Sequence, residues 1–257
     1  MFRTLILSLL LGVPLSAAHA EEPLTLCHED RDSYPWVLRD GSGLNLELLA
    51  QVAEALQLRL QLVAVPWKRC LAGLKDGHYD GAFAASFKAE RLAMGRYPTT
   101  AEGDLDVSKR LHLSLYSLYR RRGDQLGWDG QRLLGLQGRI GSLSGFSIVD
   151  FLRQHGAEVD ETSRDPLELL HMLRVGRVQG VALQAPRADQ LLSQHAELAA
   201  GVEKIALPLE QKPYFLMLSH ALVAERPALA AALWSEIERQ RDSASYQLRE
   251  MEFFRQR

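Results

Sequence analysis

Three side chains in one short stretch could together hold a small carboxylate. Trp67, Ser86 and Arg91 lie within "VPWKRCLAGLKDGHYDGAFAASFKAER", residues 65–91. A guanidinium offers two parallel donors that match a carboxylate, and a nearby hydroxyl can add a further hydrogen bond. A tryptophan ring can cover an apolar or cationic body. This combination predicts a binding site for a small polar solute.

Further candidates follow other predicted strands, where open parallel sheets place their ligands. The acidic and aromatic run "HEDRDSYPW" follows the first strand, and "SLSGFS" opens a helix whose free backbone N–H groups favour an anion. The added candidates are Glu29, Tyr34, Trp36, Phe146, Ser147 and Gln184.

Each candidate also has a structural alternative that the sequence leaves open. Arg91 could form a surface ion pair with Glu90 or Asp80, which would contribute little. The aromatic candidates could pack in the core or in a loop, Ser147 could cap a helix, and Glu29 could be a solvated loop acid.

The elements that must position these residues alternate between strand and helix. Residues 23–27 and 59–65 predict strands, and 43–58 predict a helix with an apolar stripe. A helix over 67–75, a turn at Asp76 and Gly77, and a buried strand over 80–86 follow. This β-α-β-α-β order predicts an α/β fold with parallel strands and right-handed crossovers.

A second α/β unit repeats the same logic. The long alternating runs 110–124 and 212–222 predict strands that carry the chain into this unit and back. Asp165 and Pro166 predict the start of one of its helices. We expect a first lobe over 21–115, a second lobe over 116–215 and closing helices of the first lobe over 216–257, with a hinge and a cleft between the lobes.

The N-terminus predicts export. Residues 1–20, "MFRTLILSLLLGVPLSAAHA", have a positive start, a short apolar core and a small-residue cleavage pattern, which together are typical of a secretory signal peptide. The apolar core is too short for a membrane span, which needs about 20 apolar residues. We expect a periplasmic protein that begins at Glu21, with a retained N-terminal anchor as the alternative.

Composition excludes several classes of function. Of 30 Lys and Arg residues only Arg3 falls in the signal peptide, so 29 cations face 32 acids and the mature net charge is −3. This balance gives no electrostatic reason to expect nucleic acid or an anionic membrane as partner. The eight histidines show no metal-ligand spacing, and no cofactor motif follows a strand, so we expect neither a metal nor a cofactor.

Cys27 and Cys70 are the two cysteines of the chain. Paired thiols persist as disulfides in an oxidising compartment, so we expect these two to be bridged. Two buried free thiols are the alternative, because the sequence does not give the distance between their Cα atoms.

The run "PWKRCLAGLKDGHYDGAFAASFKAERLAMGRYP", with "GRIGSLSGFS", "LRVGRVQGVALQ" and the closing helices, resembles bacterial periplasmic solute-binding proteins of family 3. That resemblance covers the mature chain and implies a type II two-lobed fold with a two-strand hinge. It implies that Arg91 holds the α-carboxylate of an amino-acid-like solute, with Ser86 as hydroxyl, Trp67 as stacking ring and residues 145–147 as the second-lobe turn.

The same resemblance implies partners and an alternative. Such binders deliver solutes to an ABC permease or act with a membrane sensor, and we expect a monomer that is not an enzyme. A periplasmic cyclohexadienyl dehydratase of the same fold is the alternative. The aspartate that amino-acid binders carry after the second-lobe strand is replaced here by Gln184 and Ala185, so what holds an α-ammonium group is open.

Overall fold

Three parallel strands form one end of the sheet in the computed structural model, which describes residues 23–255. The predicted signal peptide, residues 1–20, lies outside the described residues. β1 pairs with both β2 and β3 in parallel register, and a helix crosses over between successive strands. The elements are β1 (Leu24–Glu29), α1 (Leu44–Ala55), β2 (Leu60–Val65), α2 (Trp67–Lys75) and β3 (Gly81–Ser86). The predicted β-α-β-α-β order is confirmed.

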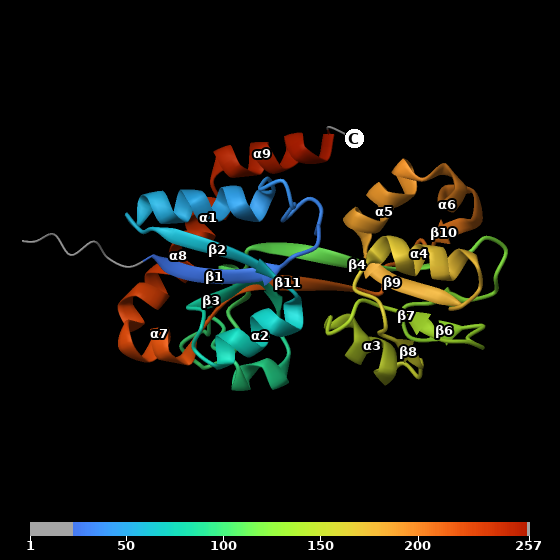
Figure 1. Ribbon diagram of the computed structural model, residues 1–257, viewed down its shortest axis with the longest axis horizontal. Coiled ribbons are helices and arrows are strands. Elements are labelled where there is room, and N and C mark those ends of the chain that lie inside the picture. The colour runs from blue at the N-terminus through green and yellow to red at the C-terminus, as the bar shows by residue number, and fades with distance from the viewer. Residues whose placement is uncertain (1–22, 256–257) are drawn as a thin grey trace, which may run out of the picture.

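Two long antiparallel strands cross the molecule and join its two halves (Figure 1). β11 (Glu210–Leu218) pairs with β3 along one part and with β4 (His112–Arg121) along another. β4 then pairs with β9 (Gly180–Gln184), so a continuous sheet runs in the order β2-β1-β3-β11-β4-β9-β7-β8. Both predicted crossing strands are confirmed. The predicted lobe boundaries, 115/116 and 215/216, fall inside them and stay a prediction.

The second half is built around β9. Its elements are β5 (Gly127–Trp128), β6 (Leu133–Leu134), β7 (Ile140–Gly141), α3 (Ile148–Gln154), β8 (Val159–Asp160), α4 (Pro166–Arg174), α5 (Ala185–Gln194), α6 (Ala196–Gly201) and β10 (Val202–Lys204). Asp165 caps α4 by accepting from the Leu167 N–H, as its sequence predicts. The sequence did not predict α5 and α6.

The chain ends on the first half of the molecule. The remaining elements are the 3₁₀ helices η1 (Ala89–Ala93) and η2 (Val107–Lys109) and the helices α7 (His220–Glu225), α8 (Pro227–Arg241) and α9 (Ala244–Arg255). Buried Tyr246 of α9 donates a hydrogen bond to the Leu44 carbonyl of α1 at 3.1 Å. We call the half with β1–β3 and α7–α9 the first lobe, and the half with α3–α6 the second (Figure 1). Within residues 23–255 there is no helix long and apolar enough to span a membrane.

A β-bulge in β3 sets which side chains face the cleft. Phe83 and Ala84 stand opposite one β11 residue, because the register shifts between Phe215 and Met217. Ala84 has φ of 57°, a left-handed conformation that is unusual for a residue with a side chain. Strict alternation would place Ala82 and Ala85 on opposite faces, yet both belong to one core cluster. The bulge therefore leaves Phe83, Ala84 and Ser86 to line the cavity between the lobes.

Candidate functional site

A cavity between the lobes collects most of the predicted site residues. Its lining comes from the loop after β1, the ends of β3 and β9, the starts of α2, α3, α4 and α5, and single residues of η1 and β11. The predicted residues in this lining are Glu29, Trp67, Ser86, Arg91, Phe146, Ser147 and Gln184. The structure thus brings predicted side chains that are up to 155 positions apart, Glu29 and Gln184, around one space.

The Arg91 guanidinium is buried and reaches both lobes. The side chain is 2% exposed, and Nη1 donates to the Ser86 carbonyl at 2.6 Å. Nη2 donates to the Gly145 carbonyl of the second lobe at 3.0 Å. The Nε–H of Arg91 has no hydrogen-bond partner among residues 23–255. The surface ion pair that the sequence left open is wrong, because Glu90 pairs with Lys88 and Arg91 is buried.

Two hydroxyl groups close the inner end of the cleft. The Ser86 hydroxyl donates to the Ser147 hydroxyl at 2.8 Å, which links β3 to the start of α3. Ser147 is the N-cap residue of α3, but its side chain accepts no capping hydrogen bond. The Tyr97 hydroxyl donates to the Ser86 carbonyl at 2.8 Å. Burial raises the pKa of Tyr97 to about 12, so this donor keeps its proton at neutral pH.

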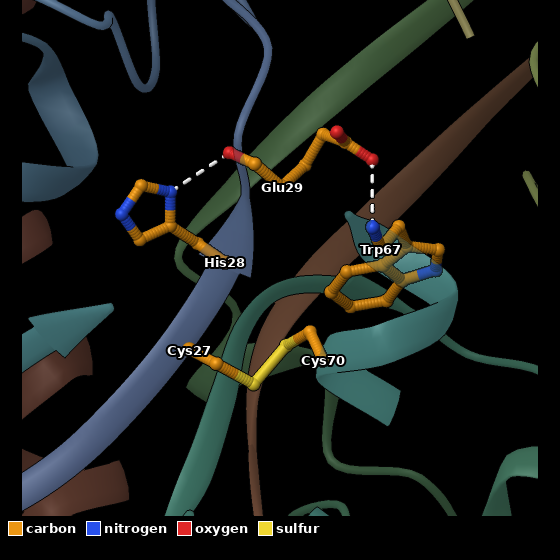
Figure 2. The surroundings of a disulfide bond; sticks show 5 residues. All are labelled: Cys27, His28, Glu29, Trp67 and Cys70. Carbon is orange, nitrogen blue, oxygen red and sulfur yellow. Dashed lines mark hydrogen bonds between the residues drawn. A yellow bond between two sulfur atoms is a disulfide. The ribbon is translucent and has the colours of Figure 1, made fainter. Parts of the chain in front are cut away.

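Trp67 and Glu29 form one side of the cavity and are anchored together (Figure 2). Trp67 is the first residue of α2, and its backbone N–H donates to Glu29 Oε2 at 3.0 Å. A carboxylate at a helix N-terminus is favourable because it meets the unsatisfied N–H groups there. The Arg91 guanidinium lies over the Trp67 ring, 5.3 Å from the centroid, so the ring covers a cation of the chain itself.

A disulfide fixes this wall. Cys27 of β1 and Cys70 of α2 are bonded, with their Cα atoms 5.6 Å apart, as the sequence predicts. Figure 2 shows the bond below the Glu29 and Trp67 pair in this view, with Cys70 on the same helix as Trp67. Both cysteines are fully buried in the cluster beneath β1 and β3. The crosslink therefore fixes the start of α2 against the end of β1 where both border the cleft.

Ion pairs tie the loop after β1 to the second lobe. Arg164, just before α4, donates to Glu29 at 2.6 Å and to Asp30 at 2.5 Å. Arg187 of α5 lies 3.5 Å from Asp32. Every one of these pairs joins a first-lobe acid to a second-lobe arginine. They favour the arrangement in which the lobes are together.

The Glu29 and Asp30 carboxyl groups influence each other through Arg164 and through a direct interaction. Burial raises the pKa of Glu29, and the neighbouring Asp30 raises it further, while Arg164 opposes both effects. The bond to Glu29 lowers the pKa of Asp30. Of the two carboxyl groups, Glu29 is the one that takes up a proton first as pH falls.

Gln184 lies at the end of β9 and is 7% exposed. Its side-chain Oε1 accepts a hydrogen bond from the Ser33 hydroxyl at 3.2 Å, another contact between the lobes. A neutral amide thus stands where β9 ends. It can orient a polar group, but it brings no negative charge to the site.

Two aromatic residues predicted for the site are placed elsewhere. The Tyr34 hydroxyl donates to the Phe253 carbonyl of α9, and the two rings pack 5.8 Å apart. Trp36 is 3% exposed and stacks on the His112 ring at 3.9 Å. The loop turns these rings away from the cavity because α9 and the first-lobe core offer apolar surface to them. Their neighbours Ser33 and Val37 line the cavity instead.

Several lining residues were missed by the sequence analysis, above all Arg164, Arg187 and Tyr214. A signal for Arg187 was present in "QAPRAD". A cation in the first turn of a helix is opposed by the helix dipole, so an arginine there calls for a nearby anion. Arg164 stands beside the Asp165–Pro166 helix start, where no pattern distinguishes it from a surface arginine.

The described residues contain no group of three or more His, Cys, Asp or Glu side chains that could hold a metal ion. The arrangement is suited to recognition of a small anion: a buried guanidinium, two hydroxyls, an aromatic wall and second-lobe arginines around one cavity.

Comparison with known proteins identifies the fold. No protein-family model matches the chain, and a search of curated proteins finds no match. Among solved structures, the GluR0 ligand-binding core from Nostoc punctiforme in complex with L-glutamate is similar, with a TM-score of 0.68 and 19% identity over 90% of this chain and 99% of that one.

Two further structures show the range of proteins with this architecture. A histidine kinase sensor domain with similarity to periplasmic binding proteins has a TM-score of 0.71 and 15% identity over 90% of this chain and 95% of that one. The ancestral amino acid-binding protein AncCDT-1, a precursor of cyclohexadienyl dehydratase, has a TM-score of 0.66 and 13% identity over 90% and 95%. The chain therefore has the two-lobed α/β fold of the periplasmic binding proteins.

Proposed function

We propose that this chain is a periplasmic binding protein for a small polar solute that carries a carboxylate. The observation that carries the proposal is Arg91: a guanidinium that is 2% exposed, lines the cavity between the lobes and keeps its Nε–H without a partner within the described chain. An unpaired buried donor is unfavourable, and a carboxylate oxygen is the acceptor that relieves it best.

Contacts between the lobes suit binding by closure. The Ser86 and Ser147 hydroxyls, the Arg91 and Gly145 pair, and the ion pairs of Arg164 and Arg187 all form only when the lobes meet. A solute that bridges the lobes adds its own contacts to this state alone. It therefore stabilises the closed form by its differential affinity for that form.

Catalysis is not part of the proposal. The carboxyl groups that line the cavity, Glu29 and Asp32, are both engaged with arginines, and Glu29 also accepts from the Trp67 N–H. A general acid of the dehydratase kind needs a carboxyl that is free to meet the substrate. We propose a binder that is not an enzyme.

The location and the partners follow from the same proposal. Residues 1–20 would direct export to the periplasm, and the mature protein would act as a monomer. The closed form would be read by an ABC permease or by a membrane sensor. The AncCDT-1 and sensor-domain structures support a role in solute recognition only through their fold.

Thermal unfolding of the mature protein tests the proposal. The sample is unfolded and refolded to remove any carried-over ligand, and then heated with amino acids, organic acids, polyamines and small peptides. We expect the midpoint to rise with at least one carboxylate compound, by an amount that grows with its concentration. Absence of a shift with every carboxylate, in a refolded sample with a cooperative transition, would contradict the proposal.

A conservative variant assigns the effect to the site. Arg91→Lys keeps a cation but removes the Nε–H and the planar fork, so it should lose most of the shift. Arg69→Lys is the matched control, because Arg69 is exposed on α2 and does not line the cavity. An equal shift in both variants would place the solute elsewhere.

A further inference from the structure

Two arginines, one from each lobe, line the same cavity and each keeps a buried N–H without an acceptor. They are Arg91 of the first lobe and Arg187 of the second, and in both the unpaired atom is Nε among residues 23–255. Folded proteins pair nearly all of their buried polar groups, so two arginines of this kind in the lining of one cavity are a specific feature. Each calls for an acceptor that the chain does not supply.

The ion pairs around the cavity leave an excess of positive charge. Arg164 meets Glu29 and Asp30, and Arg31 lies 3.9 Å from Asp165. No carboxylate of the described chain pairs with Arg91, whose hydrogen bonds from Nη1 and Nη2 go to carbonyl and hydroxyl oxygens. Burial raises the pKa of Glu29, which reduces the negative charge on this side still further as pH falls.

Arg187 is the second group that is short of negative charge. Its carboxylate neighbour, Asp32, lies 3.5 Å away and is shared with Arg39, which lies 3.4 Å from it. Arg187 also stands in the first turn of α5, where the helix dipole disfavours a cation. Burial lowers the pKa of the Arg187 guanidinium, with Asp32 opposing this effect. An anion beside Arg187 would accept a hydrogen bond from the unpaired Nε–H. Its negative charge would also offset the unfavourable helix dipole and the lost hydration of the guanidinium.

The cavity has no matching place for an ammonium group. Both carboxyl groups in its lining, Glu29 and Asp32, already meet arginines. Gln184, at the end of β9, is a neutral amide whose oxygen accepts from Ser33. An ammonium group would have to compete with an arginine for one of these acids, next to two further guanidinium groups. That competition is unfavourable because like charges repel most strongly where water is excluded.

We propose that the solute is a small dicarboxylate without an amino group, bound with one carboxylate at Arg91 and the other at Arg187. This inference rests on the proposed function and names the substrate class of the same site. Each carboxylate meets a guanidinium from a different lobe, so the two anionic ends of the molecule hold the lobes together. A monocarboxylate engages one lobe's arginine and leaves the other unpaired.

Calorimetric titration of the stripped protein separates the classes of solute. The probes are succinate, glutarate and adipate, the monocarboxylates butyrate and valerate, and the amino acids aspartate and glutamate. We expect one dicarboxylate to bind about tenfold or more tightly than the monocarboxylate of similar length, since it makes a second charge-assisted contact. We expect the amino acid of the same length to bind more weakly than that dicarboxylate.

Arg187→Gln tests the second contact without touching Arg91. It should reduce the preference for the dicarboxylate over the monocarboxylate to about twofold or less, while the monocarboxylate affinity stays the same. Arg177→Gln is the matched control, because it removes an exposed second-lobe arginine outside the cavity and should leave the preference unchanged.

The outcomes distinguish this inference from the proposed function. If an amino acid or a monocarboxylate binds at least as tightly as the best of succinate, glutarate and adipate, the inference is overturned and the solute-binding function stands. A dicarboxylate preference that survives Arg187→Gln overturns the assignment of Arg187. If no carboxylate binds to the refolded wild type, both the proposed function and the inference fall.

Discussion

Breaking the disulfide between Cys27 and Cys70 should destabilise the protein by an amount that can be worked out from the chain. The two residues are 43 positions apart. In the loop-entropy account, closing a loop of that length removes enough freedom from the unfolded chain to contribute about 4 kcal/mol. Since a domain of this size loses about 2–4 °C in its unfolding midpoint per kcal/mol, the reduced protein should unfold about 8–16 °C lower.

The assay is thermal unfolding followed by circular dichroism, with and without a thiol-free reductant, after thiol titration has confirmed the redox state. Cys27→Ala/Cys70→Ala is the control, and it should unfold near the temperature of the reduced wild type whether or not reductant is present. The reasoning fails if fully reduced wild type unfolds within about 2 °C of the oxidised protein. It also fails if the protein from an oxidising compartment carries two free thiols.

Three further predictions concern stability. Asp160→Asn should cost about 1–3 kcal/mol in urea unfolding, because the Asp160 side chain is 3% exposed and accepts from the Thr162 N–H and hydroxyl. The Thr162 hydroxyl lowers the pKa of Asp160 in the folded protein. The stability that the ionised Asp160 contributes is therefore present above pH about 4 and is lost as pH falls through the lower folded pKa. A variant whose free energy of unfolding decreases with acid as steeply as that of wild type would refute this. Burial lowers the pKa of His112 well below its usual value, so the unfolded chain binds the proton at a higher pH than the folded protein does. The free energy of unfolding should therefore fall as pH drops below about 6.5. His112→Gln should make this dependence on pH less steep. Gly145→Ala should lower stability by about 1 kcal/mol, because Gly145 has φ of 80°, which is unfavourable for a residue with a side chain. Gly127→Ala should change stability little, because Gly127 is not among the glycines with positive φ and has room for a Cβ. Equal unfolding midpoints for the two variants would contradict backbone strain at position 145.

Much of the fold could be predicted because local signals agree with it. Helix α2 begins and ends at the predicted residues. Its end was predictable because Gly77, in the turn that follows, adopts φ of 78°. Asp165 and Pro166 start α4 as predicted. Helix α5 was missed because it follows β9 directly, with no loop and no side-chain cap, so the Pro186 in its first turn stood without a second start signal.

The site was predictable only in part, because it is assembled from segments far apart in the chain. Arg91, Ser86 and Trp67 were found from one stretch, and the structure brings them together. Arg187 was missed because its place at the cavity depends on α5, a helix that was not predicted. Trp36 could not be assigned, because its partner in the core, His112, lies on a distant strand.

A crystal structure of the refolded protein with its tightest-binding solute tests the central claim most directly. The account predicts a carboxylate oxygen at about 3 Å from Nε of Arg91, between Trp67 and Ser147, with the lobes in contact. A solute bound outside the cavity would contradict it. So would a solute in the cavity that leaves Arg91 bonded only to the Ser86 and Gly145 oxygens.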